Sequence, residues 1–198
     1  TRACVITTMS EILGLGLTHY PGLLVPHQHW PQFLQRNVEI GRIAPDLYAD
    51  RSRWPAQLRE EWGDDDGVTA AREHERQLLE GFRALREELD AFNPDLVVIW
   101  GEDQYENFRN DCVPPFCVYM FDKLECRPFG GGRRPFKSTE SAYGLPPEAV
   151  ISVLGHHDAA SGLCRALLEQ EFDVAYATET RAEAGLAHSF SNTMVFLD

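Results

Sequence analysis

The most constraining feature of the sequence is a long segment with helical periodicity over residues 69–92, followed at once by Asn93-Pro94 and an apolar run. Within the segment, large apolar side chains recur at steps of four, three, four and three residues: Leu78, Phe82, Leu85, Leu89 and Phe92. This spacing predicts an amphipathic helix of about six turns. Asn93-Pro94 ends it, because the residue before a proline avoids the helical conformation. The apolar run at 95–100 then predicts a strand buried on both faces of a parallel sheet.

The rest of the chain alternates strand and helix patterns. Further strands are predicted at residues 12–18, 116–120, 173–177 and 193–197, and further helices at 157–170 and from Trp30 to Val38. Residues 39–68 are expected to be irregular, and residues 122–147 to form a long loop that could cover a site. The alternation predicts the α/β class, with one mainly parallel sheet flanked by helices and the 69–92 helix on its face. A single domain is expected over residues 9–198, after an N-terminal extension, residues 1–8, without function.

Composition narrows the class of protein. The 198 residues are 43% hydrophobic and 11% aromatic, as in a globular chain. Acidic residues outnumber basic ones by 31 to 18, a net charge of −13, so neither a nucleic acid nor an anionic membrane surface is expected as a partner. No apolar run approaches the roughly 20 residues of a membrane span. The five cysteines form no CxxC pair and are expected to be reduced thiols in a cytoplasmic protein.

Polar residues that could carry chemistry lie next to the predicted strands. His19 follows the first strand, Glu102-Asp103-Gln104 follow the strand at 95–100, and His188 precedes the last strand. Because α/β sheets bind ligands outside the carboxyl ends of their strands, we predict that His19, Gln104 and His188 converge on one cleft. There His188 could act as a general acid or base. Each residue also has an ordinary interpretation: a structural histidine, a solvated strand end and a surface-loop histidine.

The remaining histidines and the common catalytic templates are less informative. His156-His157 open a predicted helix, which favours a capping role, and His27-x-His29 favours only adventitious metal binding. The sequence contains no GxGxxG, GxxxxGK[ST], GxSxG or HExxH. Dinucleotide, P-loop, serine-hydrolase and zincin chemistries therefore lack their signatures.

Five short segments stand in a recognisable order along the chain. They are residues 16–22, 95–108, 113–116, 155–156 and 185–188, with the sequences GLTHYPG, DLVVIWGEDQYENF, VPPF, GH and GLAH. Together they resemble the catalytic (beta) subunit of class III extradiol ring-cleavage dioxygenases, of the protocatechuate 4,5-dioxygenase type. The resemblance extends over about residues 10–198.

The resemblance implies a non-haem Fe(II) held by two histidines and one glutamate, with open positions for a catecholate and dioxygen. It implies that His19 is an iron ligand, that Gln104 occupies the position of the second ligand, and that His188 is the acid/base residue. Tyr20 and Tyr105 are the implied substrate-binding residues. Two departures follow: the amide of Gln104 is a weaker ligand than imidazole, and the family's glutamate ligand lies in a C-terminal region beyond the present sequence.

The predicted function is therefore the opening of a catecholic aromatic ring, with a small aromatic substrate and dioxygen as partners. A homo-oligomer or a small partner subunit is also consistent with the resemblance. Two alternatives stay open: a metal-free binding or scaffold protein that keeps the fold, and a hydrolase or decarboxylase that uses His19 and His188 without iron. Because Gln104 is a weak ligand, the chain purified without added metal is expected to carry little iron and to leave catechols intact.

Overall fold

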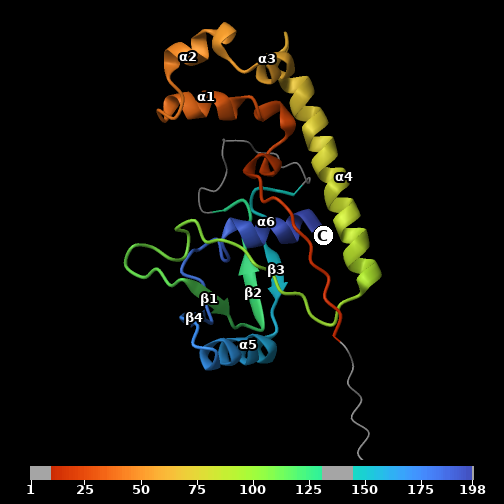
Figure 1. Ribbon diagram of the computed structural model, residues 1–198, viewed down its shortest axis with the longest axis vertical. Helices are drawn as coiled ribbons and strands as arrows, with labels where there is room; N and C mark the ends of the chain where they lie inside the picture. The colour runs from red at the N-terminus through yellow and green to blue at the C-terminus, as the bar shows by residue number, and fades with distance from the viewer. Residues whose placement is uncertain (1–9, 131–144, 198) are drawn as a thin grey trace, which may run out of the picture.

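The computed structural model describes residues 10–130 and 145–197, which form a mixed α/β structure (Figure 1). Three short 3₁₀ helices are η1 (Pro21–Leu24), η2 (His27–His29) and η3 (Arg51–Arg53). The α-helices are α1 (Gln32–Glu39), α2 (Pro45–Ala49), α3 (Ala56–Trp62), α4 (Val68–Phe92), α5 (His157–Glu169) and α6 (His188–Leu197). The strands are β1 (Phe116–Tyr119), β2 (Lys123–Cys126), β3 (Ile151–Leu154) and β4 (Val174–Ala177).

The two longest helices form where the apolar periodicity predicts them. Helix α4 begins after Gly67 and ends at Asn93, both in the left-handed conformation, and the following proline prevents its continuation. Helix α5 begins after His156, whose side chain accepts a hydrogen bond from the backbone N–H of Ala159. The predictions of a helix at 69–92 and a helix at 157–170 are confirmed, and so is the capping role of His156.

The described strands form two separate pairs. Strands β1 and β4 are parallel, with Phe116 opposite Val174, and β2 and β3 are antiparallel, with Lys123 opposite Leu154. The first pair confirms the strands predicted at 116–120 and 173–177. The second pair was not predicted, and β2 lies inside the segment 122–147 that was expected to be a loop. Its only signal is a short alternation in which Lys123 is exposed and Cys126 is buried, which is too brief to stand out in sequence. These two pairs do not show a mainly parallel sheet.

Three predicted strands are absent from the described residues. The prediction of a strand at 193–197 is wrong, because these residues belong to α6, where Ser191, Asn192, Val195 and Phe196 are buried at helical spacing. Residues 12–18 and 95–100 have no regular secondary structure and pair with none of the described strands. The side chains of Leu96, Val97, Val98 and Trp100 are between 48% and 80% exposed. An apolar segment becomes part of a sheet only when its backbone is hydrogen-bonded to a neighbouring strand, and none of the described strands pairs with these two segments.

The core joins the N-terminal segment to helices α4 and α6. Leu23, Leu24 and Val25 are almost fully buried, and Phe82 of α4 packs on Phe196 of α6 with ring centroids 5.0 Å apart. Helix α4 packs mainly on η2 and α6, so it does not lie on a sheet face as predicted. The segment at 39–68, expected to be irregular, contains the short helices α2, η3 and α3.

Three of the helices lie apart from the two sheets (Figure 1). Helices α1, α2 and α3 gather at one end, the two sheets and α5 lie at the other, and α4 runs along one side (Figure 1). Among the described residues, no helix has the length and apolar content needed to cross a bilayer.

Replacing Phe82 by Ala tests whether the α4–α6 contact holds the fold together. Phe82 is 4% exposed, so its truncation leaves a cavity and is expected to lower the free energy of unfolding by about 3–5 kcal/mol. Arg83→Ala at the neighbouring exposed position is the control, with an expected change within about 0.5 kcal/mol. Urea denaturation followed by circular dichroism measures both. Equal midpoints for the two variants would contradict the packing.

Candidate functional site

The structure brings together two histidines from distant parts of the chain. His19 lies at the end of the extended N-terminal segment, immediately before Tyr20 and η1, and His188 is the first residue of α6. Their rings are in edge-to-face contact, with centroids 5.0 Å apart and planes at 63°. The predicted convergence of these two side chains is present in the structure, although residues 12–18 form no strand.

Glu102 connects His19 to Gln104. Its Oε1 lies 3.2 Å from His19 Nε2 and also accepts a hydrogen bond from Gln104 Nε2. Its backbone carbonyl accepts a hydrogen bond from Ser189 Oγ at 2.6 Å, which fixes this segment against α6. Gly101 permits the close approach, since a Cβ at this position would lie 2.8 Å from Ser189 Oγ. The Glu102 carboxylate thus pairs with both His19 and Gln104, and His188 adjoins this group through its ring contact with His19. We call His19, Glu102, Gln104 and His188 the cluster.

The loop that carries Glu102 and Gln104 is held in a tight turn by Asp103. The Asp103 carboxylate accepts hydrogen bonds from the backbone N–H groups of Glu106, at 2.8 Å, and of Asn107, at 3.0 Å. Tyr105, which lies between Asp103 and Glu106 in the sequence, has a φ of 61°. This left-handed conformation is strained for a side chain of this size. The Asp103 carboxylate therefore has a structural role, because its oxygens accept hydrogen bonds from backbone N–H groups of the turn.

Asn107 fixes the turn to the segment before α6. Its side chain is buried; Oδ1 accepts a hydrogen bond from the backbone N–H of Ala182, and Nδ2 donates one to the carbonyl of Gly185. Gly185 has a φ of 88°, which glycine adopts without strain. Both sides of the cluster are therefore tied together by buried hydrogen bonds across more than 70 residues of sequence.

Glu106 makes the most enclosed contact of the site. Its Oε1 accepts a hydrogen bond from the backbone N–H of His188 at 3.1 Å and also pairs with Nδ1 of the His188 ring. Both side chains are 17% exposed. Glu106 was not among the predicted site residues. The one signal in the sequence is a third acidic residue close behind Glu102 and Asp103, which is unusual for a single short turn.

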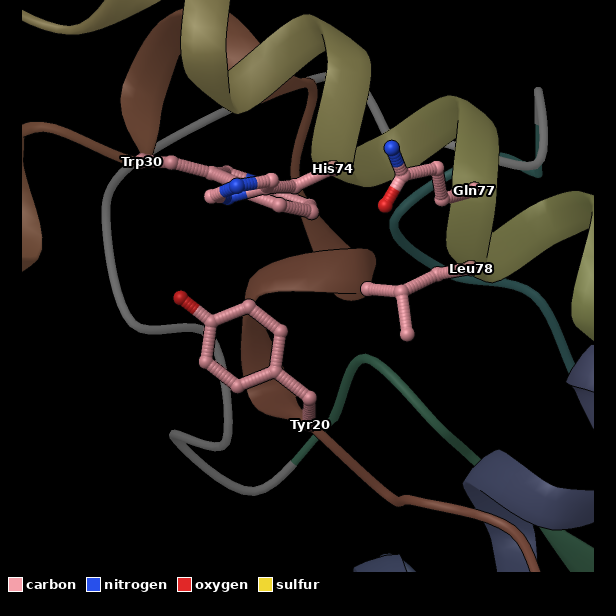
Figure 2. Close-up of a pocket in the computed structure, with 5 residues that line it drawn as sticks. All are labelled: Tyr20, Trp30, His74, Gln77 and Leu78. Carbon is pink, nitrogen blue, oxygen red and sulfur yellow. The ribbon is translucent and has the colours of Figure 1, made fainter. Parts of the chain in front are cut away.

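The two tyrosines predicted to bind substrate differ in burial: Tyr20 is packed among other aromatic rings, and Tyr105 is exposed. The Tyr20 ring packs on Trp30 and Phe33, with centroids 5.3 and 5.9 Å away, and burial raises the pKa of its hydroxyl. Tyr20 also lines a pocket of about 400 Å³ between the N-terminal segment and α4, with Trp30, His74, Gln77 and Leu78 (Figure 2). Tyr105 is 65% exposed.

The donor atoms of the cluster partly match the needs of a metal ion. Two ligands at right angles on one metal lie about 3 Å apart for bonds of about 2.1 Å, and His19 Nε2 and Glu102 Oε1 are 3.2 Å apart. The amide of Gln104 is a third, neutral donor. In the described part of the chain, no three His, Cys, Asp or Glu side chains are grouped to hold a metal ion. The residues present therefore fit two positions of a facial triad rather than a complete one.

Comparison with known proteins identifies distant homologues. A segment of 107 residues is 32% identical to 2,3-dihydroxyphenylpropionate/2,3-dihydroxicinnamic acid 1,2-dioxygenase of Burkholderia vietnamiensis, covering 54% of this chain and 28% of the relative. A segment of 44 residues is 46% identical to the second such enzyme of Pseudomonas putida, covering 22% and 14%. The Comamonas testosteroni enzyme is 28% identical over 116 residues, covering 58% and 29%.

The chain spans less than a third of the length of these curated relatives. No family model matches it, and no solved structure matches it significantly. The relatives are named as 1,2-dioxygenases of 2,3-dihydroxyphenylpropionate and 2,3-dihydroxicinnamic acid, and the resemblance to the class III catalytic subunit stays a prediction.

Replacing Gln104 by His tests the geometry of the cluster through metal affinity. The substitution puts a second imidazole beside Glu102, which already lies next to His19. We expect the affinity for Co²⁺ or Zn²⁺ to rise about tenfold or more, which is roughly 1.4 kcal/mol, as measured by calorimetric titration.

The matched control is Gln170→His at the end of α5, outside the cluster. Adding Glu102→Gln to the Gln104→His variant should abolish the gain, because the anionic donor is lost. Equal metal affinities for the Gln104→His and Gln170→His variants would show that the cluster does not have the geometry described.

Proposed function

We propose that the chain serves the extradiol-type cleavage of a catecholic aromatic ring, at the cluster formed by His19, Glu102, Gln104 and His188. The observation that carries this proposal is the edge-to-face contact of His19 and His188, each of which pairs with its own carboxylate, Glu102 and Glu106 respectively. It combines an acid/base histidine with an imidazole and a carboxylate that can hold a cation. The names of the homologues support it independently, since each is a dioxygenase of a 2,3-dihydroxyphenyl substrate.

In this proposal His188 exchanges protons with the substrate. A catechol must lose hydroxyl protons before its ring becomes electron-rich enough to react with dioxygen, and a proton must return when the ring opens. His188 is well placed for both steps, because its ring contacts His19 and its side chain is only 17% exposed. A positioned acid/base group of this kind contributes about 10²–10⁴-fold to the rate.

Fe(II) is the cofactor that we propose, with His19 and Glu102 as its holders and Gln104 as a weak third donor. When bound, iron would supply the path by which electrons pass from the ring to dioxygen. The carboxylates of Glu102, Asp103 and Glu106 give the surroundings a negative charge, which favours a cation. Iron affinity is nevertheless expected to be low, because only one imidazole and one carboxylate are strong donors.

The roles of Tyr20 and Tyr105 in binding substrate are also proposals. Tyr105 adjoins Gln104 in the turn and is exposed, so its ring is free to pack against a bound aromatic ring. Tyr20 adjoins His19 and would act from the other side, where its ring is fixed by Trp30. The alternative of a metal-free binding or scaffold protein is not favoured, because the homologues carry enzyme names.

The iron content of the purified chain is the first measurement. We expect well under one iron per chain after purification without added metal, and no ring opening in that state, because the donor set is incomplete. Elemental analysis of the dialysed protein measures the iron. Stoichiometric iron that survives dialysis would show that the ligands are misplaced.

The second measurement is ring opening after loading with Fe(II) under anaerobic conditions. On admission of oxygen, 2,3-dihydroxyphenylpropionate or protocatechuate should give a coloured ring-fission product. His188→Gln should lower kcat by about 10²-fold or more, since it removes the acid/base group. His157→Gln, at an exposed position, is the matched control and should leave kcat unchanged. Equal rates for the two variants, or no product from the loaded chain, would overturn the proposal.

A further inference from the structure

Glu106 holds both the backbone and the ring of His188 with a single oxygen atom. Its Oε1 accepts the hydrogen bond from the His188 backbone N–H and pairs with ring Nδ1. The two residues are 82 positions apart in sequence, and both side chains are mostly buried. This contact is therefore a specific tertiary interaction and not a surface ion pair. Exposed ion pairs contribute only about 0–1 kcal/mol to the free energy of unfolding.

The position of Glu106 is fixed by the turn that carries it. Its backbone N–H donates to Asp103, the next residue is Asn107, and Asn107 is hydrogen-bonded to the segment that leads into α6. These bonds fix the backbone from which the Glu106 side chain reaches His188, and the contact between Glu106 and ring Nδ1 then sets the orientation of the imidazole. The His188 ring is thus held in one orientation before any ligand arrives.

The chemistry of the pair selects one tautomer of His188. An ionised carboxylate only accepts hydrogen bonds, so Nδ1 must carry the proton that it shares with Glu106. In the neutral imidazole the lone pair then lies on Nε2. Without Glu106 the ring could carry its proton on either nitrogen, and in one of these forms Nε2 could not accept a proton.

We propose that Glu106 is a positioning residue for proton transfer: it holds His188 as the Nδ1–H tautomer and so keeps Nε2 available to take a proton from the substrate. This inference rests on the proposed function for its catalytic consequence, but not for its structural content. The competing interpretation is that Glu106 only braces the first turn of α6 by accepting the backbone N–H of His188. The two interpretations differ in what happens to the ring.

The experiment compares Glu106→Met and Glu106→Gln with the unmodified chain. Met keeps the length of the side chain but accepts no strong hydrogen bond, whereas Gln keeps an acceptor oxygen. Long-range ¹H–¹⁵N spectra of ¹⁵N-histidine-labelled protein report the tautomer of each imidazole, and His188→Gln assigns the signal. The spectra are recorded at about pH 8, above the ordinary histidine pKa of about 6.5.

The unmodified chain and Glu106→Gln should show the Nδ1–H form of His188, and Glu106→Met should show mainly the Nε2–H form. In the Fe(II)-loaded assay, Glu106→Met should lower kcat by about 10²-fold, with KM changed far less, and Glu106→Gln should retain most of the activity. Glu87→Met, at an exposed position of α4, is the matched control. Glu106→Asp replaces Glu106→Met if the latter does not fold, and its shorter reach should also release the ring.

The outcomes separate the two interpretations. A purely structural role predicts a lower midpoint of thermal unfolding for Glu106→Met with the Nδ1–H form retained, and this result would overturn the proposal. The tautomer measurement needs no turnover. If the loaded chain opens no catechol while the tautomer shifts as expected, the proposed function fails and the control of His188 by Glu106 stands.

Discussion

The arrangement of the site depends on the buried hydrogen bonds of Asn107. They join the turn at 103–107 to Ala182 and Gly185, just before α6 begins at His188. A buried amide that lost these partners would cost roughly 1–3 kcal/mol, so the two segments are strongly held together. This attachment brings the turn next to the start of α6, where Ser189 also donates a hydrogen bond to the Glu102 carbonyl.

Three carboxylates lie within the five residues 102–106, and each has different hydrogen-bond partners. Asp103 accepts backbone N–H groups inside the turn, Glu106 binds His188, and Glu102 faces His19 and Gln104. Like charges this close destabilise a fold unless each has a partner. Only Glu102 is paired solely with groups that could also bind a ligand, which distinguishes it from the other two as the candidate donor for a cation.

The sequence predicts the two longest helices of this chain well, and its short helices, the C-terminal helix and its strands less well. The periodicities of α4 and α5 are long and unambiguous, whereas the strands are four residues each, too short for alternation to be distinctive. Residues 193–197 look like a strand in isolation, but the buried face of α6 includes Ser191 and Asn192, polar residues that conceal the helical pattern. The pairing of Glu106 with His188 depends on tertiary contact and has no local signature.

The convergence of His19, Gln104 and His188 was predicted from strand ends, yet residues 12–18 and 95–100 pair with none of the described strands. The three residues nevertheless come close together, because the His19 ring contacts His188 and Glu102 pairs with both His19 and Gln104. Ser189 donates a hydrogen bond to the Glu102 carbonyl, and Asn107 is hydrogen-bonded to Ala182 and Gly185. Side-chain hydrogen bonds thus join these segments where a sheet would have supplied backbone hydrogen bonds. Each such bond contributes about 1 kcal/mol. The placement of the cluster therefore rests on a few directional polar contacts, and the exposed apolar run at 96–100 contributes little to it.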